Sequence, residues 1–364
     1  MPAPTTDILR KTADLTIDVA LEPAHHLLNS LVLLNKSQHL SGYAEWVTNT
    51  AVALTPQQLH RNKLVLLGLH YAVVPFRSWS SFEAYLTNLS AHNPNTLRDR
   101  VLDAYENMSC RPEAPQINRK QLLSSPEIYL QYLSDRFPEE AIDEKIEREA
   151  YALMIDPPQM QQTIVAHLRD MWETVLKPEW ARIEPLLQAS VDAFAAVDFR
   201  GMAPLEAART VAGQELPEHW QEMLATPDAR LREIIFVPSA HIGPYLGMFR
   251  PDGTLWLLFG ARAPQGTLAT SPDLSRSELL VRLNALADDT RLRILQAIRE
   301  AGELCSQEII AQLDVSQSAA SRHLKQLSAT GFLSERRREG AKCYSLDRER
   351  IEDVLAAISA YLLT

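Results

Sequence analysis

The sequence predicts a mainly α-helical protein with a small β-hairpin region, in which an N-terminal helical domain precedes a C-terminal winged helix-turn-helix domain. Gly is scarce, at 12 of 364 residues, and apolar residues recur at three-to-four spacing through most of the chain. Residues 274–364 hold 13 basic and 13 acidic side chains, so the net charge of −10 lies in residues 1–273. This charge asymmetry is typical of a DNA-reading module joined to a domain with another role.

Changes in composition predict the domain boundaries. Residues 1–14 are polar and predict a flexible leader, and residues 15–262 predict a mostly helical sensor or interaction domain. Pro264, Gly266 and Pro272 mark residues 263–273 as a linker. Residues 274–364 then form the predicted winged helix-turn-helix DNA-binding domain.

Capping side chains followed by proline predict several helix starts in the N-terminal domain, because such a side chain accepts a hydrogen bond from a free backbone N–H. These starts are Thr55-Pro56, Asn93-Pro94, Ser125-Pro126 and Asp156-Pro157. Pro178 interrupts the last pattern and predicts a kink or a new helix. Residues 233–237, 245–249 and 255–259 predict strands, with a β-hairpin in the region 233–260.

The C-terminal pattern indicates two short helices joined by a tight turn. Ser306 opens the first helix, Asp314-Val315 makes the turn, and Ser316 caps the second helix, which ends before Gly331. A basic hairpin and a last amphipathic helix follow. Two helices with a short turn and a basic β-ribbon are the parts of a winged helix-turn-helix domain.

The second of these helices is the predicted recognition helix. Ala320, Leu324 and Leu327 share its apolar face, and the polar residues lie on the opposite face, where amides, hydroxyls and cations suit base edges and phosphates. The predicted contacts with double-stranded DNA are Gln317, Ser318, Ser321, Arg322, His323 and Lys325 in the helix, and Arg336, Arg337, Arg338 and Lys342 in the wing.

Two stretches, residues 286–295 (LADDTRLRIL) and 315–324 (VSQSAASRHL), resemble the ArsR family of winged-helix repressors. The resemblance covers residues 278–362, about a quarter of the chain, and this chain is similar to regulators of that family with a long N-terminal helical extension. It implies a homodimer formed through the first and last helices of the module. It also implies repression at a palindromic operator, whose half-sites lie about one helical turn apart.

The chain departs from the family at its metal sites. In the Cys-x-Cys position that the resemblance implies, Cys305 is present and Gln307 replaces the second Cys, and residues 351–364 contain no His. We therefore expect neither a metal nor any other cofactor. Cys305 is either a small buried residue or a redox-sensitive thiol. The three scattered cysteines, Cys110, Cys305 and Cys343, predict reduced thiols and a cytoplasmic location.

The N-terminal domain is thus the expected place for a small-molecule effector of unknown identity. The alternative is a protein-interaction or dimerisation module without a ligand. No catalytic motif is present, so we do not expect an enzyme. His25-His26 predicts one surface and one core residue, and the nearby Ser239 and His241 predict a polar strand end. The six tryptophans either form core or line an apolar pocket.

No apolar run approaches the roughly 20 residues that a helix needs to cross a bilayer, so we expect no membrane association. The first 14 residues also lack the apolar core of a signal peptide.

Overall fold

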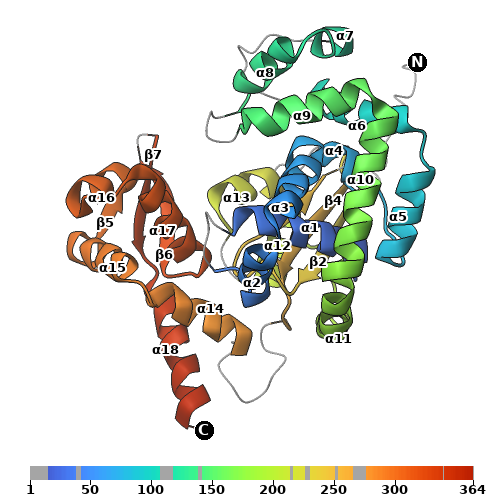
Figure 1. Cartoon of the computed structure of the whole chain (residues 1–364). Coiled ribbons are helices and arrows are strands. Elements are labelled where there is room, and N and C mark those ends of the chain that lie inside the picture. Colours follow the sequence, from blue (N-terminus) through green and yellow to red (C-terminus); the bar gives the residue numbers. More distant parts are fainter. Residues whose placement is uncertain are drawn as a thin grey trace, which may run out of the picture.

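The computed structural model describes residues 15–37, 42–106, 118–137, 142–213, 216–225, 230–250, 253–264, 276–338 and 340–363. The predicted leader (residues 1–14), Cys110 and nearly all of the predicted linker lie outside the described residues. The model confirms a mainly helical fold with small sheets and a winged helix-turn-helix at the C-terminal end (Figure 1).

The N-terminal part, residues 15–264, is built mainly from helices. These helices are α1 (Pro23–Lys36), α2 (Glu45–Ala53), α3 (Pro56–Lys63), α4 (His70–Val73), α5 (Phe82–Ala91), α6 (Pro94–Glu106), α7 (Arg119–Leu122), α8 (Pro126–Ser134), α9 (Glu144–Ile155), α10 (Pro157–Met171), α11 (Lys177–Phe194), α12 (Pro204–Ala212) and α13 (Glu218–Ala225), with the π-helical turns η1 (Leu64–Gly68) and η3 (Trp172–Leu176). Among the described residues, no helix is both long and apolar enough to span a bilayer.

A four-stranded sheet lies at the centre of the N-terminal part. Its strands are β1 (Thr16–Val19), β2 (Glu233–Ser239), β3 (Gly247–Phe249) and β4 (Thr254–Gly260), in the order β1-β2-β4-β3. The predicted hairpin corresponds to the antiparallel pair β3–β4. The hairpin is nevertheless only one edge of a mixed sheet, because β2 pairs in parallel with both β1 and β4. Strand β1 was not predicted, since its pairing partner lies more than 200 residues away in the sequence.

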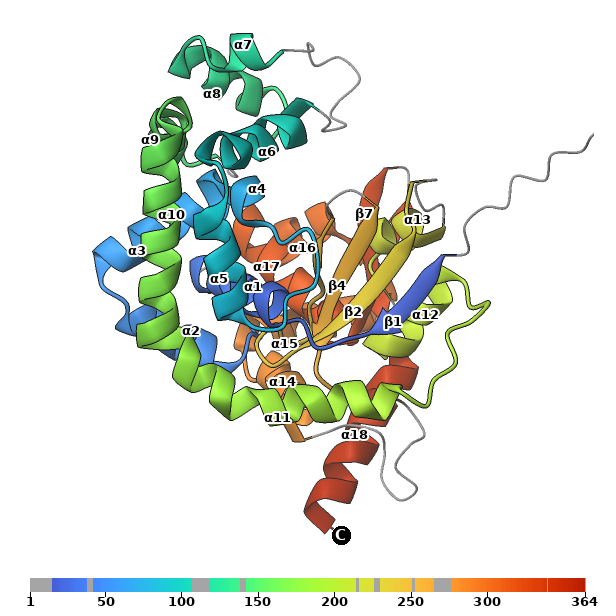
Figure 2. The ribbon, with the colours of Figure 1, turned by 90° about the vertical axis from the view of Figure 1, so that its right-hand side faces the viewer.

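Helices cover both faces of this sheet. Side chains alternate between the faces along a strand, so Ile235 and Val237 of β2 join the large core formed with α1 to α10, while Ile234 and Phe236 join a second core. The second core contains residues of α11, α12 and α13. Figure 2 shows the strands between α1 and α5 on one side and α12 and α13 on the other. Burial on both faces explains why the central strands β2 and β4 read as nearly continuous apolar runs.

The capping predictions are confirmed at the helix starts for which the structure gives cap geometry. Thr55 forms a capping box with Gln58, and the side chains of Ser125 and Asp156 accept hydrogen bonds from the third residue of their helices. The interruption expected at Pro178 takes the form of the π-helical turn η3, after which Pro178 lies in the first turn of α11.

A buried polar network joins α1, α3 and α10. His167, only 2% exposed, lies with its Nε2 3.1 Å from Asn62 Oδ1. The amide of Asn62 in turn donates to the backbone oxygen of Leu31 and to Asn35 Oδ1. Burial lowers the pKa of His167 to about 4, because desolvation disfavours the imidazolium form. The neutral ring carries its proton on Nε2 and donates a hydrogen bond to Asn62 Oδ1.

Because of the lowered pKa of His167, the folded protein is expected to lose stability as the pH becomes acidic. The folded pKa of about 4 lies below the unfolded value of about 6.5, so the unfolded chain takes up the proton first and the contribution to stability is lost as pH falls from 6.5 towards 4. At pH 5 the loss amounts to about 2 kcal/mol. Urea unfolding followed by tryptophan fluorescence at pH 7.5 and pH 5 measures it, with His167→Gln as the non-titrating control. Equal pH dependence in the two proteins would contradict the assignment.

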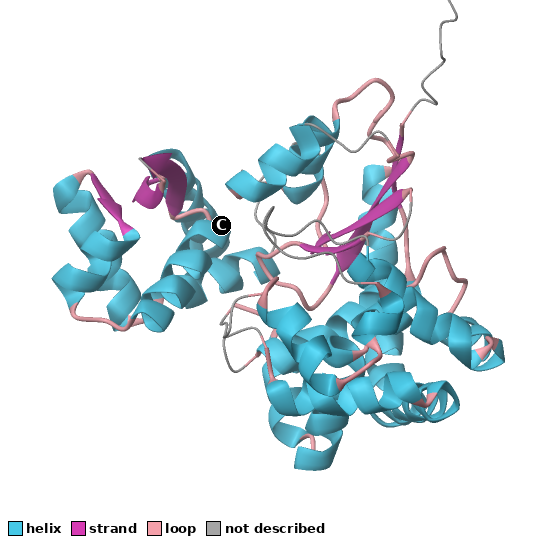
Figure 3. Cartoon of the chain, turned by 90° about the horizontal axis from the view of Figure 1, so that it is seen from above, coloured by secondary structure: helices cyan, strands magenta, loops and turns pink. Residues whose placement is uncertain are grey.

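The C-terminal domain, defined here as residues 276–363, has its own hydrophobic core. Figure 3 shows the chain from above, with the helices and strands of this domain on the left. Its elements are α14 (Arg276–Leu286), α15 (Asp289–Ala301), β5 (Glu303–Cys305), α16 (Ser306–Leu313), α17 (Gln317–Ala329), β6 (Leu333–Arg338), β7 (Ala341–Leu346) and α18 (Arg348–Leu363). Strands β6 and β7 pair antiparallel as the wing, and β5 adds a third strand on the other side of β7. We keep the domain boundary at residues 263–273 as a proposal.

Candidate nucleic-acid interface

Helices α16 and α17 form the helix-turn-helix. Asp314 ends α16 in the left-handed conformation, with φ of 52°, which Asp tolerates better than most residues. The Ser316 hydroxyl then caps α17 by accepting a hydrogen bond from the Ala319 N–H at 3.2 Å. Leu324 and Leu327 of α17 are buried beside Ile309 of α16. This packing joins the two helices and leaves the polar face of α17 outside the core of the C-terminal domain.

The exposed face of α17 carries five of the six helix residues predicted to contact DNA. They are all solvent-exposed: Gln317, Ser318, Ser321, Arg322 and Lys325. His323 differs, because its ring is half-buried and its Nδ1 lies 3.8 Å from the carboxylate of Asp288, the N-cap of α15. Burial is the largest cause of the lowered pKa of His323. The structure therefore places His323 at the contact between α15 and α17 rather than on the open face.

The wing presents its basic side chains to solvent. Arg336 and Arg338 both form ion pairs with Glu303 of β5, Arg338 also reaches Glu308, and Lys342 pairs with Glu335 at 3.3 Å. These surface ion pairs of the wing are weak, because an exposed ion pair stabilises a protein by at most about 1 kcal/mol. The cations of the wing can therefore exchange a carboxylate for a phosphate when a nucleic acid approaches.

Arg291 is an anchor of this domain that the sequence reasoning did not identify. Its guanidinium group is buried and donates to the backbone oxygens of Ala285, at 2.5 Å, and Asn284, at 2.8 Å, at the end of α14. It also donates to Gln326 Oε1 of α17 at 2.9 Å. One side chain thus links the first helix of the domain, α15 and the recognition helix. Its position as the third residue of α15, following the capping Asp288, was the only signal in the sequence.

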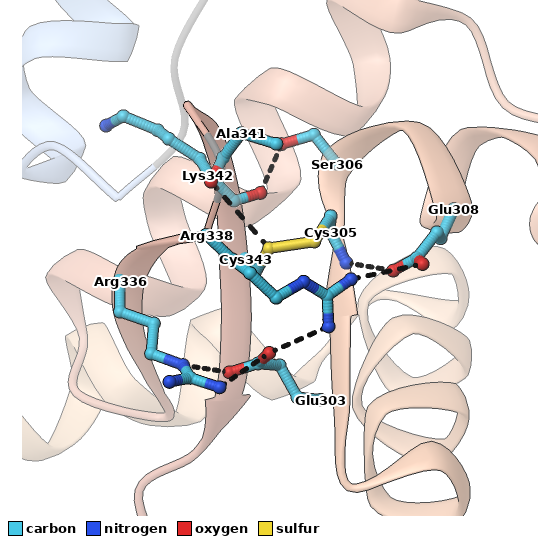
Figure 4. The surroundings of a disulfide bond; sticks show 9 residues. All are labelled: Glu303, Cys305, Ser306, Glu308, Arg336, Arg338, Ala341, Lys342 and Cys343. Carbon is cyan, nitrogen blue, oxygen red and sulfur yellow. Dashed lines mark hydrogen bonds and ion pairs between the residues drawn. A yellow bond between two sulfur atoms is a disulfide. The ribbon is translucent and has the colours of Figure 1, made fainter.

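A disulfide joins Cys305 of β5 to Cys343 of β7 (Figure 4). The two residues are directly opposite each other in the antiparallel pair β5–β7. The prediction of reduced thiols is therefore wrong for Cys305 and Cys343. The spacing of 38 residues could not reveal the pair, because β5 was not predicted and only the sheet register brings the two residues together. The bond fixes the start of α16 to the wing.

Sulfur of Cys305 is consequently not available as a thiolate ligand. Within the described part of the chain, no group of three or more His, Cys, Asp or Glu side chains is arranged to hold a metal ion. The Glu303, Glu308, Arg336 and Arg338 side chains around the disulfide are engaged in the ion pairs given above, as Figure 4 shows.

The N-terminal histidines are core residues, which corrects the expectation that one of His25 and His26 lies at the surface. Both are completely buried. His25 stacks on Trp256 with ring centroids 4.4 Å apart, and its Nδ1 lies 3.2 Å from the buried carboxylate of Glu22. His26 packs between Trp180 and His241. Aromatic and helical packing around α1 therefore encloses both rings.

His241 follows the end of strand β2 at Ser239, as expected, but it is completely buried, and it lies in a hydrogen-bonded chain with Ser30 and Glu179. Its Nδ1 is 2.8 Å from Ser30 Oγ, and its Nε2 is 2.7 Å from Glu179 Oε1. The nearby Ser239 hydroxyl does not contact the imidazole; it accepts a hydrogen bond from the backbone N–H of His241. Ser30 and His241 are both 0% exposed, so a substrate carbonyl cannot reach the hydroxyl in this structure. The chain holds α1, α11 and the end of β2 together.

The fold and the exposed basic surface define the C-terminal domain as a winged helix-turn-helix of the DNA-binding type. Residues 288–335 match the family described as bacterial regulatory protein, arsR family, so the chain carries an ArsR-family helix-turn-helix domain.

Known relatives match this same part of the chain. The arsenic resistance transcriptional regulator ArsR1 of Pseudomonas putida is 45% identical over 64 residues, which cover 18% of this chain and 50% of that protein. The arsenical resistance operon repressor of Escherichia coli is 46% identical over 52 residues, covering 14% and 44%. The matches thus span about half the length of these curated relatives. The matched family and relatives are transcriptional regulators, not enzymes.

A solved structure of a possible transcriptional regulator for arsenical resistance is 26% identical, with a TM-score of 0.21, and the match covers 23% of this chain and 85% of that one. The AntR antimony-specific transcriptional repressor is 27% identical with a TM-score of 0.20, covering 26% and 84%.

Proposed function

We propose that this protein is a DNA-binding transcriptional regulator, acting as a repressor in the cytoplasm. The observation that carries the proposal is the exposed face of α17, where Gln317, Ser321 and Lys325 follow one another at four-residue spacing beside a basic wing. An amide, a hydroxyl and a cation on one helical face suit base edges in a major groove. The wing residues Arg336, Arg337, Arg338 and Lys342 would bind flanking phosphates or the minor groove.

The proposal includes a homodimer formed through α14 and α18. These two helices pack on each other, and several large apolar side chains on them face solvent in the single chain. These side chains are Leu280 and Leu283 of α14, and Leu355, Tyr361, Leu362 and Leu363 of α18. A second copy would bury this surface, because exposed apolar patches mark interaction sites. A two-fold dimer would read a palindromic operator with half-sites about one helical turn apart.

The proposal also assigns control of DNA binding to the N-terminal part through a small ligand. The disulfide removes Cys305 from metal binding, and the described C-terminal residues offer no other metal-type cluster. We therefore assign the effector to a site that involves the N-terminal part, rather than to a metal site within the C-terminal domain.

Replacing Arg322 with Ala tests the DNA-binding face. Arg322 is exposed on α17, and its loss is expected to weaken specific binding by roughly 1–3 kcal/mol, or about 5- to 150-fold in Kd, if it reads a base. The measurement is a gel-shift titration at fixed, moderate salt on DNA from upstream of the protein's own gene. Arg299→Ala is the matched control, since Arg299 is an exposed arginine in the last turn of α15 and is not among the predicted DNA contacts. An unchanged Kd for Arg322→Ala would remove the residue from the interface, and absence of specific binding by the unaltered protein would overturn the function.

A further inference from the structure

A cleft of about 1080 Å³ separates the recognition helix from the N-terminal part; we call it the interdomain cleft. Helix α1 and the segment between β2 and β3 form one wall, and α17 with the wing forms the other. Ligand pockets for small molecules usually measure about 300–1,000 Å³. The interdomain cleft is therefore large enough for a small organic molecule together with water.

The two facing helices each present one polar stripe to the interdomain cleft. Helix α1 contributes Asn29 and Lys36, seven residues apart, and α17 contributes Ser321, Lys325 and Ser328. Residues at such spacings share one face of a helix. Contacts hold the walls together: Ala329 packs against the N-terminal core, and Arg350 of α18 reaches the backbone oxygen of Gly213 at 3.5 Å.

The charges lining the interdomain cleft leave two cations without a carboxylate. Of the six charged lining residues, Lys342 pairs with Glu335 at 3.3 Å and Arg350 with Asp347 at 3.8 Å. Lys36 and Lys325 form no ion pair among the described residues. Solvent reaches both side chains. Enclosure in the protein lowers the pKa of Lys36, and the charge of Lys325 lowers it further. An anion between the two would relieve this repulsion.

Unsatisfied donors in the same walls point to an oxygen-bearing ligand. The side chain of Asn29 is more than nine-tenths buried, at 7% exposed, and its Nδ2 has no hydrogen-bond partner among the described residues. The buried Oγ of Ser328, on the opposite wall, is likewise without a partner there. A buried donor left unpaired destabilises the protein, so an acceptor that enters the interdomain cleft and reaches these atoms is favoured there.

The remaining lining is aromatic and apolar. Tyr43, Tyr245 and Trp220 come from the N-terminal part, and Tyr344 comes from the wing. Lys325 Nζ lies 5.9 Å from the centroid of the Tyr245 ring, so the cationic and aromatic groups adjoin. Flat apolar ligands pack well on such rings. Together with the two lysines, this lining selects a molecule with an apolar ring and an acidic group.

We propose that the interdomain cleft binds a small aromatic carboxylic acid, whose carboxylate lies between Lys36 and Lys325 and whose ring packs among the tyrosines. Such a ligand bridges the N-terminal part and α17. It covers Gln317, Ser321 and Lys325, the stripe that would enter a major groove. Ligand binding and DNA binding therefore exclude each other, and the acid acts as an inducer. This second half rests on the proposed DNA-binding function.

The ligand half is tested without DNA. Isothermal titration calorimetry of the full chain uses benzoate, phenylpropionate, 2-naphthoate and indole-3-acetate, each with its neutral amide as a control. We expect at least one acid to bind at up to roughly millimolar concentration and its amide to bind at least tenfold more weakly. Lys36→Gln and Asn29→Leu should each weaken the acid about tenfold. Lys177→Gln, an exposed lysine of α11 paired with Glu173, should not. Binding by none of the acids, equal binding of the amides, or unchanged affinity in Lys36→Gln would overturn the ligand site.

The coupling half is tested by gel shift on upstream DNA with and without the acid that binds. The acid should raise the apparent Kd for DNA, by a factor that grows with its concentration, and Lys36→Gln should shift that response to higher concentrations. A protein that binds the acid and binds DNA, with neither affecting the other, would overturn the coupling. A protein that binds the acid but no DNA would overturn the proposed function while leaving the ligand site intact.

Discussion

Replacement of Arg291 by Ala is expected to lower the free energy of unfolding of the C-terminal domain by about 3–5 kcal/mol. The substitution leaves the backbone oxygens of Ala285 and Asn284 and the buried amide of Gln326 without their charged donor. It also opens a void in which the guanidinium packed between three helices. Arg293→Ala is the matched control, because Arg293 is exposed on the same helix and should change the stability by no more than about 0.5 kcal/mol.

Amide hydrogen exchange measures this effect where tryptophan fluorescence cannot. All six tryptophans lie at or before residue 256, so fluorescence reports only the N-terminal part. Exchange of the α15 and α17 amides should accelerate strongly in Arg291→Ala, while urea unfolding followed by fluorescence stays close to that of the unaltered protein. Protection of α17 equal to that in Arg293→Ala would show that Arg291 is not the anchor described here.

Reduction of the Cys305–Cys343 disulfide is expected to lower the stability of the C-terminal domain by about 2–4 kcal/mol. The bond closes a loop over a separation of 38 residues that contains the whole helix-turn-helix, so breaking it releases much conformational freedom in the unfolded chain. The Cys305→Ser/Cys343→Ser double variant should be destabilised to a similar extent and should not respond further to a reducing agent.

Alkylation of the denatured, unreduced protein checks the bond itself. Of the three cysteines, only Cys110 should react, and all three should react after reduction. Three reactive thiols before reduction would show that the bond does not form under the conditions used. Faster hydrogen exchange in β5 and the first turn of α16 after reduction would locate the loss of stability.

Local signals were enough to identify the C-terminal domain and many helix boundaries. A cap at Ser316, a tight turn at Asp314 and the apolar spacing of Leu324 and Leu327 each act over a few residues, and all are present in the structure. The exposed polar face of α17 followed from the same periodicity. For His323 the structure adds what the periodicity does not show, namely that Asp288, the N-cap of a neighbouring helix, lies against its ring.

Long-range pairing determined the features that the sequence could not reveal. Strand β1 is too short to be distinguished by pattern, and it forms only because β2 offers a parallel edge. Cys305 meets Cys343 through the register of β5 and β7. Ser30 and His241 are 211 residues apart and meet because α1 packs on the end of β2.

The sequence by itself thus determined the class of domain at the C-terminal end, its helix caps and the stripe of polar residues on α17, because these depend on neighbours three or four residues away. Only the tertiary structure decided that this stripe faces a cleft lined by Lys36 and Asn29 of α1. The physical reason is that burial, charge repulsion and unpaired donors are properties of atoms brought together by packing. Two lysines almost 300 residues apart become one site only when α1 and α17 lie face to face.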